Sequence, residues 1–206
     1  MPKYKMVIEY DGTSYSGWQG QTNARSIQGT LIETVRRVFA CEVDIQGAGR
    51  TDAGVHAMGQ VAHLEIPKKV PPRTILKKLN DELPSNINIV RLEEAKADFH
   101  ARHHAEGRSY LYILSRKRTA FGKRYVWWVR DPLDMKTMEA VMQMFRGFHG
   151  FASFADKRRE KSASSLVQLD TATIKRCDDL ILFRFAGSHF LWKMVRRLVG
   201  GTVEAG

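Results

Sequence analysis

Hydrophobic residues recur with two different periods in the first half of the chain. Runs with a period of two indicate strands in which one face is buried. Runs with a period near 3.6 indicate helices with one apolar face. The expected strands are residues 4–10, 43–45, 61–66 and 87–89. The expected helices are residues 26–39, where Ser26 is the capping residue, and residues 71–83, which begin at a Pro-Pro pair.

The second half of the chain is also expected to contain several strands and two helices. The expected strands are residues 107–116, 125–130, 171–177 and 180–187, the last two joined by a hairpin at Asp178-Asp179. The expected helices are residues 135–145 and 191–199, and residues 153–165 are expected to be a polar, mobile loop. The simplest architecture is an α+β fold of two related halves, residues 1–105 and 106–206, with mixed or antiparallel sheets and a groove between the halves.

The composition is that of a soluble globular protein. Of the 206 residues, 43% are hydrophobic and 27% are charged, and no apolar run approaches the ~18 residues that span a bilayer. The N-terminus lacks the apolar block of a secretory signal. Cys41 and Cys177 are isolated from each other in sequence, so we expect a reducing cytoplasm and no structural zinc.

The formal net charge of +11 and the sequence pI near 9.8 favour a polyanionic partner, above all a nucleic acid. The basic residues occur in clusters, and one cluster adjoins four aromatic residues, a combination that suits phosphates and stacked bases. A run of lysines is more often a solvated face, and the aromatics could be core. The clusters are Lys68, Lys69, Arg73, Lys77 and Lys78; Arg116, Lys117, Arg118, Lys123 and Arg124; Lys157, Arg158, Arg159 and Lys161; and Lys193, Arg196 and Arg197.

The histidines do not match a usual metal pattern. His100, His103 and His104 are close in sequence, but in an extended segment His103 would point away from the other two. His56 and His63 have no evident ligand partner in the sequence. We therefore expect no metal site, and the chain also lacks the GxGxxG, GxxxxGK[ST] and GxSxG motifs.

The run GAGRTDAGVH surrounds one carboxylate, Asp52, with glycines, an arginine, a threonine and a histidine. Glycines suit a tight turn or a backbone that lies against a ligand. Two interpretations are open at this point: Asp52 bonds to the backbone of its own turn, as many such aspartates do, or the turn displays it for chemistry.

GRTDAGVHAMGQVAH resembles the segment around the catalytic aspartate of the tRNA pseudouridine synthase A (TruA) family. Other segments resemble that family in the same order along nearly the whole chain. They are EYDGTSYSGWQGQ, RSIQGTLIE, LNDELPSNI, DFHARHHAEGRSYLYIL, GFHGFASF and FLWKMVRRLVGG.

The resemblance implies the pseudouridine synthase fold and the conversion of uridine to pseudouridine at positions 38 to 40 of the tRNA anticodon stem-loop, by a homodimer without cofactor or metal. It also implies roles for four residues. Asp52 is similar to the nucleophile, and Arg50 to the arginine that holds the nucleotide out of the helix. Tyr110 is similar to the tyrosine that stacks on the target base, and Arg196 to the basic residue that pairs with the aspartate.

Two departures from the family pattern stand out. Arg197 replaces a more usual asparagine, and Trp192 and Lys193 stand where histidine or tyrosine is common. Family members also continue some tens of residues beyond the segment that resembles GGTVEAG, so the sequence is expected to be a short member or a fragment.

Two rival functions are a non-catalytic RNA-binding module and a metal-dependent hydrolase that uses Asp52 with His56 or His63. The first predicts no change to the RNA, and the second predicts inhibition by a chelator.

Overall fold

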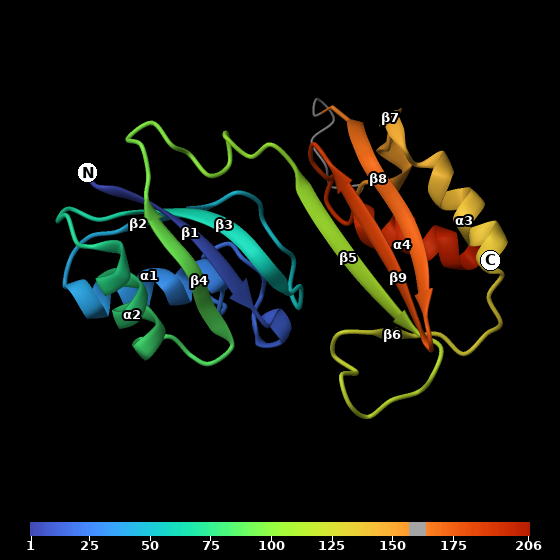
Figure 1. Cartoon of the computed structure of the whole chain (residues 1–206), viewed down its shortest axis with the longest axis horizontal. Coiled ribbons are helices and arrows are strands. Elements are labelled where there is room, and N and C mark those ends of the chain that lie inside the picture. The colour runs from blue at the N-terminus through green and yellow to red at the C-terminus, as the bar shows by residue number, and fades with distance from the viewer. Residues whose placement is uncertain (157–163) are drawn as a thin grey trace. The chain divides into compact units, whose positions relative to one another are not determined.

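The structure is a computed structural model that describes residues 1–156 and 164–206. The chain divides into two compact units, Met1–Ala105 and Glu106–Gly206, each with its own hydrophobic core. Figure 1 shows the elements of both units.

The first unit is a four-stranded antiparallel sheet with two helices. Its strand order is β2-β3-β1-β4, so the first strand of the chain lies inside the sheet between β3 and β4. The elements are β1 (Lys3–Tyr10), the 3₁₀ turn η1 (Gly12–Ser14), α1 (Ile27–Phe39), β2 (Asp44–Gly47), β3 (Ala57–Glu65), α2 (Pro72–Glu82) and β4 (Ile87–Glu94).

Local chemistry explains where the helices of this unit begin and end. The Ser26 hydroxyl accepts a hydrogen bond from the Gly29 amide at 3.1 Å, and α1 ends at Ala40 in the left-handed conformation. Pro72 occupies the first position of α2, where its missing amide hydrogen costs nothing. The alternating residues of β1 pack with the apolar faces of both helices, because Tyr4, Met6, Ile8 and Tyr10 are all buried in one cluster.

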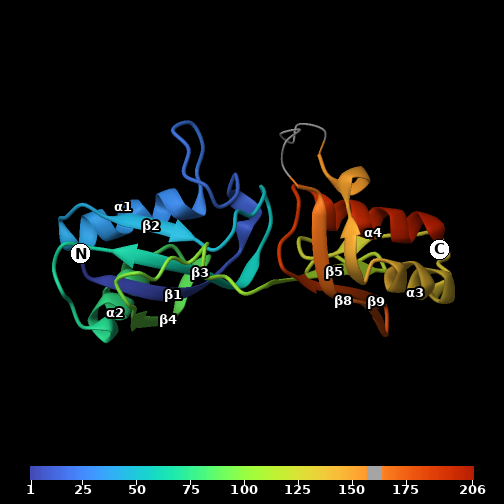
Figure 2. The ribbon, with the colours of Figure 1, turned by 90° about the horizontal axis from the view of Figure 1, so that it is seen from above.

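The second unit is a five-stranded sheet, also with two helices. Its strand order is β6-β5-β9-β8-β7, antiparallel except where β5 pairs with β6. Helices α3 and α4 contact each other and lie beside the sheet (Figure 2). The elements are β5 (Arg108–Ser115), β6 (Trp127–Trp128), α3 (Met135–Met144), β7 (Gly147–Gly150), η2 (Ala152–Phe154), β8 (Leu166–Cys177), β9 (Leu180–Gly187) and α4 (Met194–Ala205).

The predicted α+β class and the order of strands and helices are confirmed. The predicted hairpin is confirmed as well: Cys177 pairs with Leu180, and Asp178 adopts φ 51°, which suits a two-residue turn.

Four details of the second unit were wrong or missed. The strand expected at 125–130 is only Trp127–Trp128, β7 was not expected, and β8 begins at Leu166 rather than at 171. Residues 153–156 are not an open loop: η2 ends at Phe154, and Ala155 and Asp156 are buried. The rest of that predicted loop, 157–163, lies outside the described residues, as does its basic cluster.

The segment around the three neighbouring histidines is a turn and not extended. The His104 amide donates to the His100 carbonyl at 2.9 Å, and the rings of His100 and His103 lie 4.2 Å apart. The argument that His103 points away from His100 was therefore wrong.

Candidate active site

Asp52 lies on the loop that joins β2 to β3, residues 48–56. The first residue of the loop is still bonded to the sheet, because the Ala48 amide donates to the Val61 carbonyl of β3 at 2.8 Å. The Gln60 side chain then donates to the Gly49 carbonyl at 2.6 Å. Both contacts fix the start of the loop, so the chain reaches Asp52 from a defined direction.

A loop that comes earlier in the chain, residues 11–18, holds the Asp52 loop on both sides of the aspartate, and we call it the first loop. The Trp18 amide donates to the Thr51 carbonyl at 3.0 Å, immediately before Asp52. The Gly54 amide donates to the Tyr15 carbonyl at 3.2 Å, two residues after it. The hydroxyls of Tyr10 and Thr51 add a contact of 2.8 Å. The backbone at Asp52 is therefore clamped between two anchors.

The close approach of the two loops requires glycine at two positions. A Cβ at Gly12 would lie 2.0 Å from the Val55 carbonyl oxygen. Gly17 has φ +99°, and a Cβ there would lie 2.4 Å from the Thr51 carbonyl oxygen. Both contacts are with backbone atoms, which cannot move aside as a flexible side chain can. Glycine at these two positions is what allows the clamp to form.

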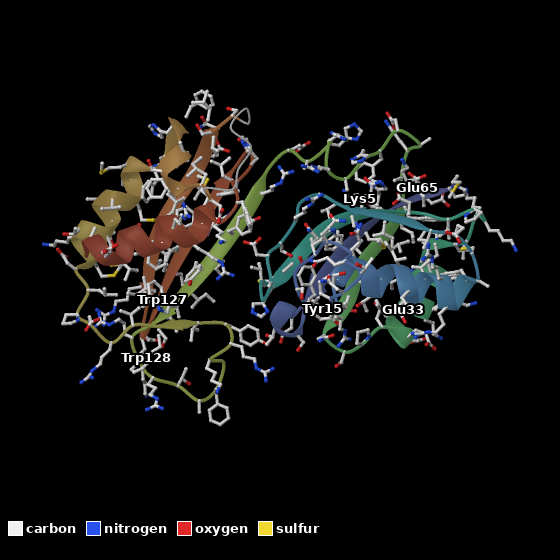
Figure 3. The ribbon with its side chains drawn as sticks, turned by 180° about the vertical axis from the view of Figure 1, so that it is seen from behind. Lys5, Tyr15, Glu33, Glu65, Trp127 and Trp128 are labelled. Carbon is white, nitrogen blue, oxygen red and sulfur yellow. The ribbon has the colours of Figure 1, made fainter. Side chains whose placement is uncertain are left out.

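Two buried aromatic residues support the clamp from below. The Tyr15 hydroxyl donates to the Asn86 side chain at 2.9 Å, and its ring, labelled in Figure 3, lies 4.7 Å from the Arg25 guanidinium. The Trp18 ring packs where a Cβ on Gly47 would stand, 2.6 Å from its nearest atom. Tyr15 and Trp18 thus anchor the first loop in the core of this unit. Because the first loop bonds to Thr51 and Gly54, it also fixes the backbone at Asp52.

The Asp52 side chain is half-buried and the Arg50 side chain is exposed. His56, at the far end of the loop, has its Nδ1 3.1 Å from the Gly12 amide nitrogen and 3.0 Å from the Asp11 carboxylate. Both partners belong to the first loop, so His56 ties the Asp52 loop to it.

The other two predicted site residues, Tyr110 and Arg196, belong to the second unit. Tyr110 lies on β5 opposite Phe185, is half-buried, and meets the Phe190 ring edge-on at 4.8 Å. Arg196 is exposed in the first turn of α4. The structure thus holds Asp52 with Arg50 in one unit and Tyr110 with Arg196 in the other.

The start of α4 is held by contacts that sequence reasoning missed. Lys193 precedes the helix in the left-handed conformation, and its ammonium lies 2.8 Å from the buried Asp156 carboxylate. The Arg197 guanidinium donates to the Ala155 carbonyl. These two contacts fasten the turn that carries Arg196 to the segment after η2.

Asp44, His63 and Glu65 bring their ligand atoms within 4.8 Å of one another. His63 is buried, and its Nδ1 accepts a hydrogen bond from the Ala101 amide at 3.1 Å, so in the neutral ring Nε2 carries the proton. A protonated Nε2 cannot coordinate a metal. The Glu65 carboxylate is already 2.8 Å from the Lys3 ammonium, which supplies a cation. The geometry favours a polar cluster over a metal centre.

Burial lowers the pKa of His63, and the neighbouring His100 and Lys3 lower it further, outweighing Asp44 and Glu65. The hydrogen bond from Lys3 lowers the pKa of Glu65. The folded state therefore favours a neutral His63 beside an ionised Glu65.

The basic clusters differ in their accessibility, because Arg116, Lys193 and Arg197 are half-buried. Every member of the cluster around α2 is exposed, and one of them, Lys69, pairs with Glu94 at 3.1 Å. No helix within residues 1–156 and 164–206 is both long and apolar enough to cross a membrane.

The family and the relatives that match this chain share one description. The family described as "tRNA pseudouridine synthase" matches residues 6–104 and 141–206. Proteins named "tRNA pseudouridine synthase A" match the whole chain. That of Thermodesulfovibrio yellowstonii is 39% identical over 217 aligned positions, and that of Sinorhizobium medicae is 40% identical over 211. This chain covers 85% of each.

The protein of the same name from Caulobacter vibrioides is 38% identical over 209 positions, with 84% of its length covered. Among solved structures, a chain of a Cbf5-Nop10-Gar1 complex aligns with a TM-score of 0.42 and 11% identity, over 97% of this chain and 54% of that one.

Proposed function

The chain belongs to the tRNA pseudouridine synthase family, and we propose that it isomerises uridine to pseudouridine in the anticodon stem-loop of tRNA, at positions 38 to 40, with Asp52 as nucleophile. The membership confirms the resemblance read from GRTDAGVH and its companion motifs. The observation that carries the proposal for Asp52 is its setting: a half-buried carboxylate whose backbone is clamped at Thr51 and Gly54.

The clamp suits the chemistry of this isomerisation. The C1′–N1 bond of uridine breaks, the uracil turns, C5 joins C1′, the hydrogen on C5 leaves as a proton, and N1 takes up a proton, so the product is an isomer of the substrate. The reaction gains and loses no electrons, so it needs no redox cofactor and no ATP. It does need a carboxylate held in a fixed place at the sugar, and a rigid loop supplies that orientation in advance.

Two of the other three residues act on the nucleotide in this proposal. A paired uridine has to leave its helix before it can react, at a cost of a few kcal/mol. Stacking on the Tyr110 ring recovers ~1–3 kcal/mol of that cost. Arg50 holds the nucleotide in its extruded position, and its exposure leaves the guanidinium accessible to a phosphate. For Arg196, which is exposed, the family resemblance implies the role of the basic partner of the aspartate and not a contact with the nucleotide.

The proposal assigns the catalytic loop to the unit Met1–Ala105, and Tyr110 and Arg196 to the unit Glu106–Gly206. It includes a homodimer, which the family resemblance supports, and a cytoplasmic location, which the two free cysteines support. The net charge of +11 supports a tRNA partner.

The test uses unmodified tRNA with tritium at uridine C5, because joining C5 to the sugar expels the label. We expect release by the wild type, none by Asp52→Ala or Asp52→Asn, and full release by Asp98→Ala, an exposed aspartate of the same unit. Binding of the tRNA by all four proteins is measured in parallel.

Each rival function predicts a different result. Tritium release by Asp52→Ala at the wild-type rate would remove Asp52 from the chemistry. Binding without release by any protein would indicate a non-catalytic RNA-binding module. Release that a chelator abolishes would indicate a metal-dependent enzyme.

A further inference from the structure

The segment that follows β5 exposes four aromatic side chains outside the site described above. We define the aromatic loop as residues 116–130, which includes the two-residue strand β6 near its end. It carries Phe121, Tyr125, Trp127 and Trp128, and Figure 3 labels the two tryptophans at its end. Phe121 is 91% exposed, and the other three are 40–50% exposed. Exposing an apolar ring of this size forgoes about 1.5–3 kcal/mol of burial, so such a group calls for an explanation.

Local hydrogen bonds hold the aromatic loop in a defined shape. The Phe121 amide donates to the Thr119 hydroxyl at 3.2 Å, and that hydroxyl donates to the Phe121 carbonyl at 2.8 Å. The Tyr125 amide donates to the Gly122 carbonyl at 2.9 Å, across a turn in which Gly122 has φ +69°. At the base of the loop, the Val129 amide donates to the Ser115 carbonyl at 3.0 Å. The Phe121 ring is therefore presented by an ordered turn.

The charge of the aromatic loop is entirely positive. It contains no Asp or Glu, and its basic residues are Arg116, Lys117, Arg118, Lys123, Arg124 and Arg130. All of them except Arg116 are exposed. The Arg118 guanidinium lies 5.9 Å from the Trp128 ring, so cation and aromatic face are already adjacent.

A hollow of about 380 Å³ lies at the foot of the aromatic loop. Its lining includes Lys117, Phe121 and Tyr125 from the loop, together with Asp179 and Leu180 of the β8–β9 hairpin. The volume falls in the range of small-ligand pockets, ~300–1,000 Å³. Lys117 thus lines the hollow together with the aromatic side chains of Phe121 and Tyr125.

We infer that the aromatic loop is a binding site for single-stranded RNA, in which unpaired bases stack on its aromatic side chains and its exposed lysines and arginines contact the phosphates. The combination of a basic track with aromatic platforms is what sequence-tolerant binding of single strands requires. A second copy of the chain is a poorer occupant, because a two-fold interface through this loop would bring the five exposed cations of one copy near the same five of the other. The inference extends the proposed function, since unpaired nucleotides of a tRNA are the natural ligand.

The test measures binding of a fluorescent ten-nucleotide oligouridylate to the full chain. Phe121→Ala should weaken binding on the order of tenfold, the loss expected for one stacked base. The control is Phe148→Ala, which removes a 63% exposed phenylalanine from β7, at the opposite edge of the same sheet from β6. We expect the control to bind within twofold of the wild type.

A second pair of variants tests the phosphate contacts. Each lost contact lowers the slope of log affinity against log salt by about 0.7, so Lys123→Gln with Arg124→Gln should lower it by about 1.4. Lys136→Gln with Arg146→Gln, two exposed cations of α3 and of the turn after it, should leave the slope unchanged.

Three results would overturn the inference: no binding of the oligouridylate by the wild type, equal losses in each variant and its control, or conversion of a dimer to a monomer by Phe121→Ala in sedimentation. The last would assign the loop to self-association. Binding is measured without turnover, so failure of the proposed chemistry is distinguishable from failure of this site.

Discussion

Gly17 and Gly54 form a matched pair for testing the clamp around Asp52. Both have positive φ, +99° and +75°, so alanine at either position carries the cost of a left-handed residue, about 1–2 kcal/mol. They differ in what a Cβ would meet. At Gly54 nothing lies within 4 Å, whereas at Gly17 the Thr51 carbonyl oxygen lies 2.4 Å away.

The difference in surroundings sets the expected magnitudes. Gly54→Ala should lower the free energy of unfolding by the conformational cost alone, about 1–2 kcal/mol. Gly17→Ala adds the displacement of the Thr51 carbonyl, and overpacking of this kind costs about 1–3 kcal/mol more. For a unit of this size 1 kcal/mol corresponds to roughly 4–8 °C in melting temperature. We therefore expect a fall of about 4–16 °C for Gly54→Ala and a larger fall, about 8–40 °C, for Gly17→Ala.

The assay is thermal unfolding followed by circular dichroism, together with hydrogen–deuterium exchange of peptides that cover residues 48–56. Gly17→Ala should also raise the exchange of the Gly54 amide, because that amide bonds to the first loop at Tyr15. Equal melting temperatures for the two variants, or unchanged exchange in Gly17→Ala, would refute the account of the clamp given above.

Further predictions concern both units. Tyr110→Phe should retain more tritium release than Tyr110→Leu, because only phenylalanine keeps a ring to stack; equal rates would count against stacking. Lys193→Met should cost about 1–3 kcal/mol in urea unfolding, because it leaves the buried Asp156 carboxylate without the ammonium 2.8 Å away; an unchanged midpoint would contradict this. Stability should fall as pH drops below about 6.5, because the unfolded chain protonates His63 before the folded chain does. His63→Gln should reduce the loss of stability between pH 7 and pH 5, measured by thermal unfolding at both pH values. A loss as large as in the wild type would exclude His63 as its source.

The sequence predicted those elements whose pattern is local and repeated. The alternation from Tyr4 to Tyr10, the cap at Ser26 and the proline at the first position of α2 are signals contained within a few residues. The elements that were missed or misjudged have weak local signals. β7 has four residues, two of them glycine, and is held by pairing with β8. β6 is a short strand at the edge of the sheet, where β5 is its one neighbour.

The candidate site was predictable as a carboxylate in a glycine-rich loop, but not as a clamp. Nothing near Asp52 in the sequence reveals that Tyr15 and Trp18 hold the residues beside it. The run YDGTSYSGW contains the relevant signal, two glycines among aromatic residues, and it identifies the first loop without saying where that loop packs. Contacts between residues so far apart along the chain are set by the whole sheet.

The clamp also has a consequence for the order in which the chain acquires its structure. The contact between Gly12 and His56 spans 44 residues, and it brings together loops that follow β1 and precede β3. Contacts of that span form slowly, because the intervening chain has to be ordered first. The clamp is therefore expected to form after the local turns of α1, and before the pairing of β1 with β4, whose partners Tyr4 and Glu94 lie still farther apart along the chain. A ribosome-bound chain that ends before residue 48 does not contain the Asp52 loop, so the clamp can form only after that loop has been synthesised.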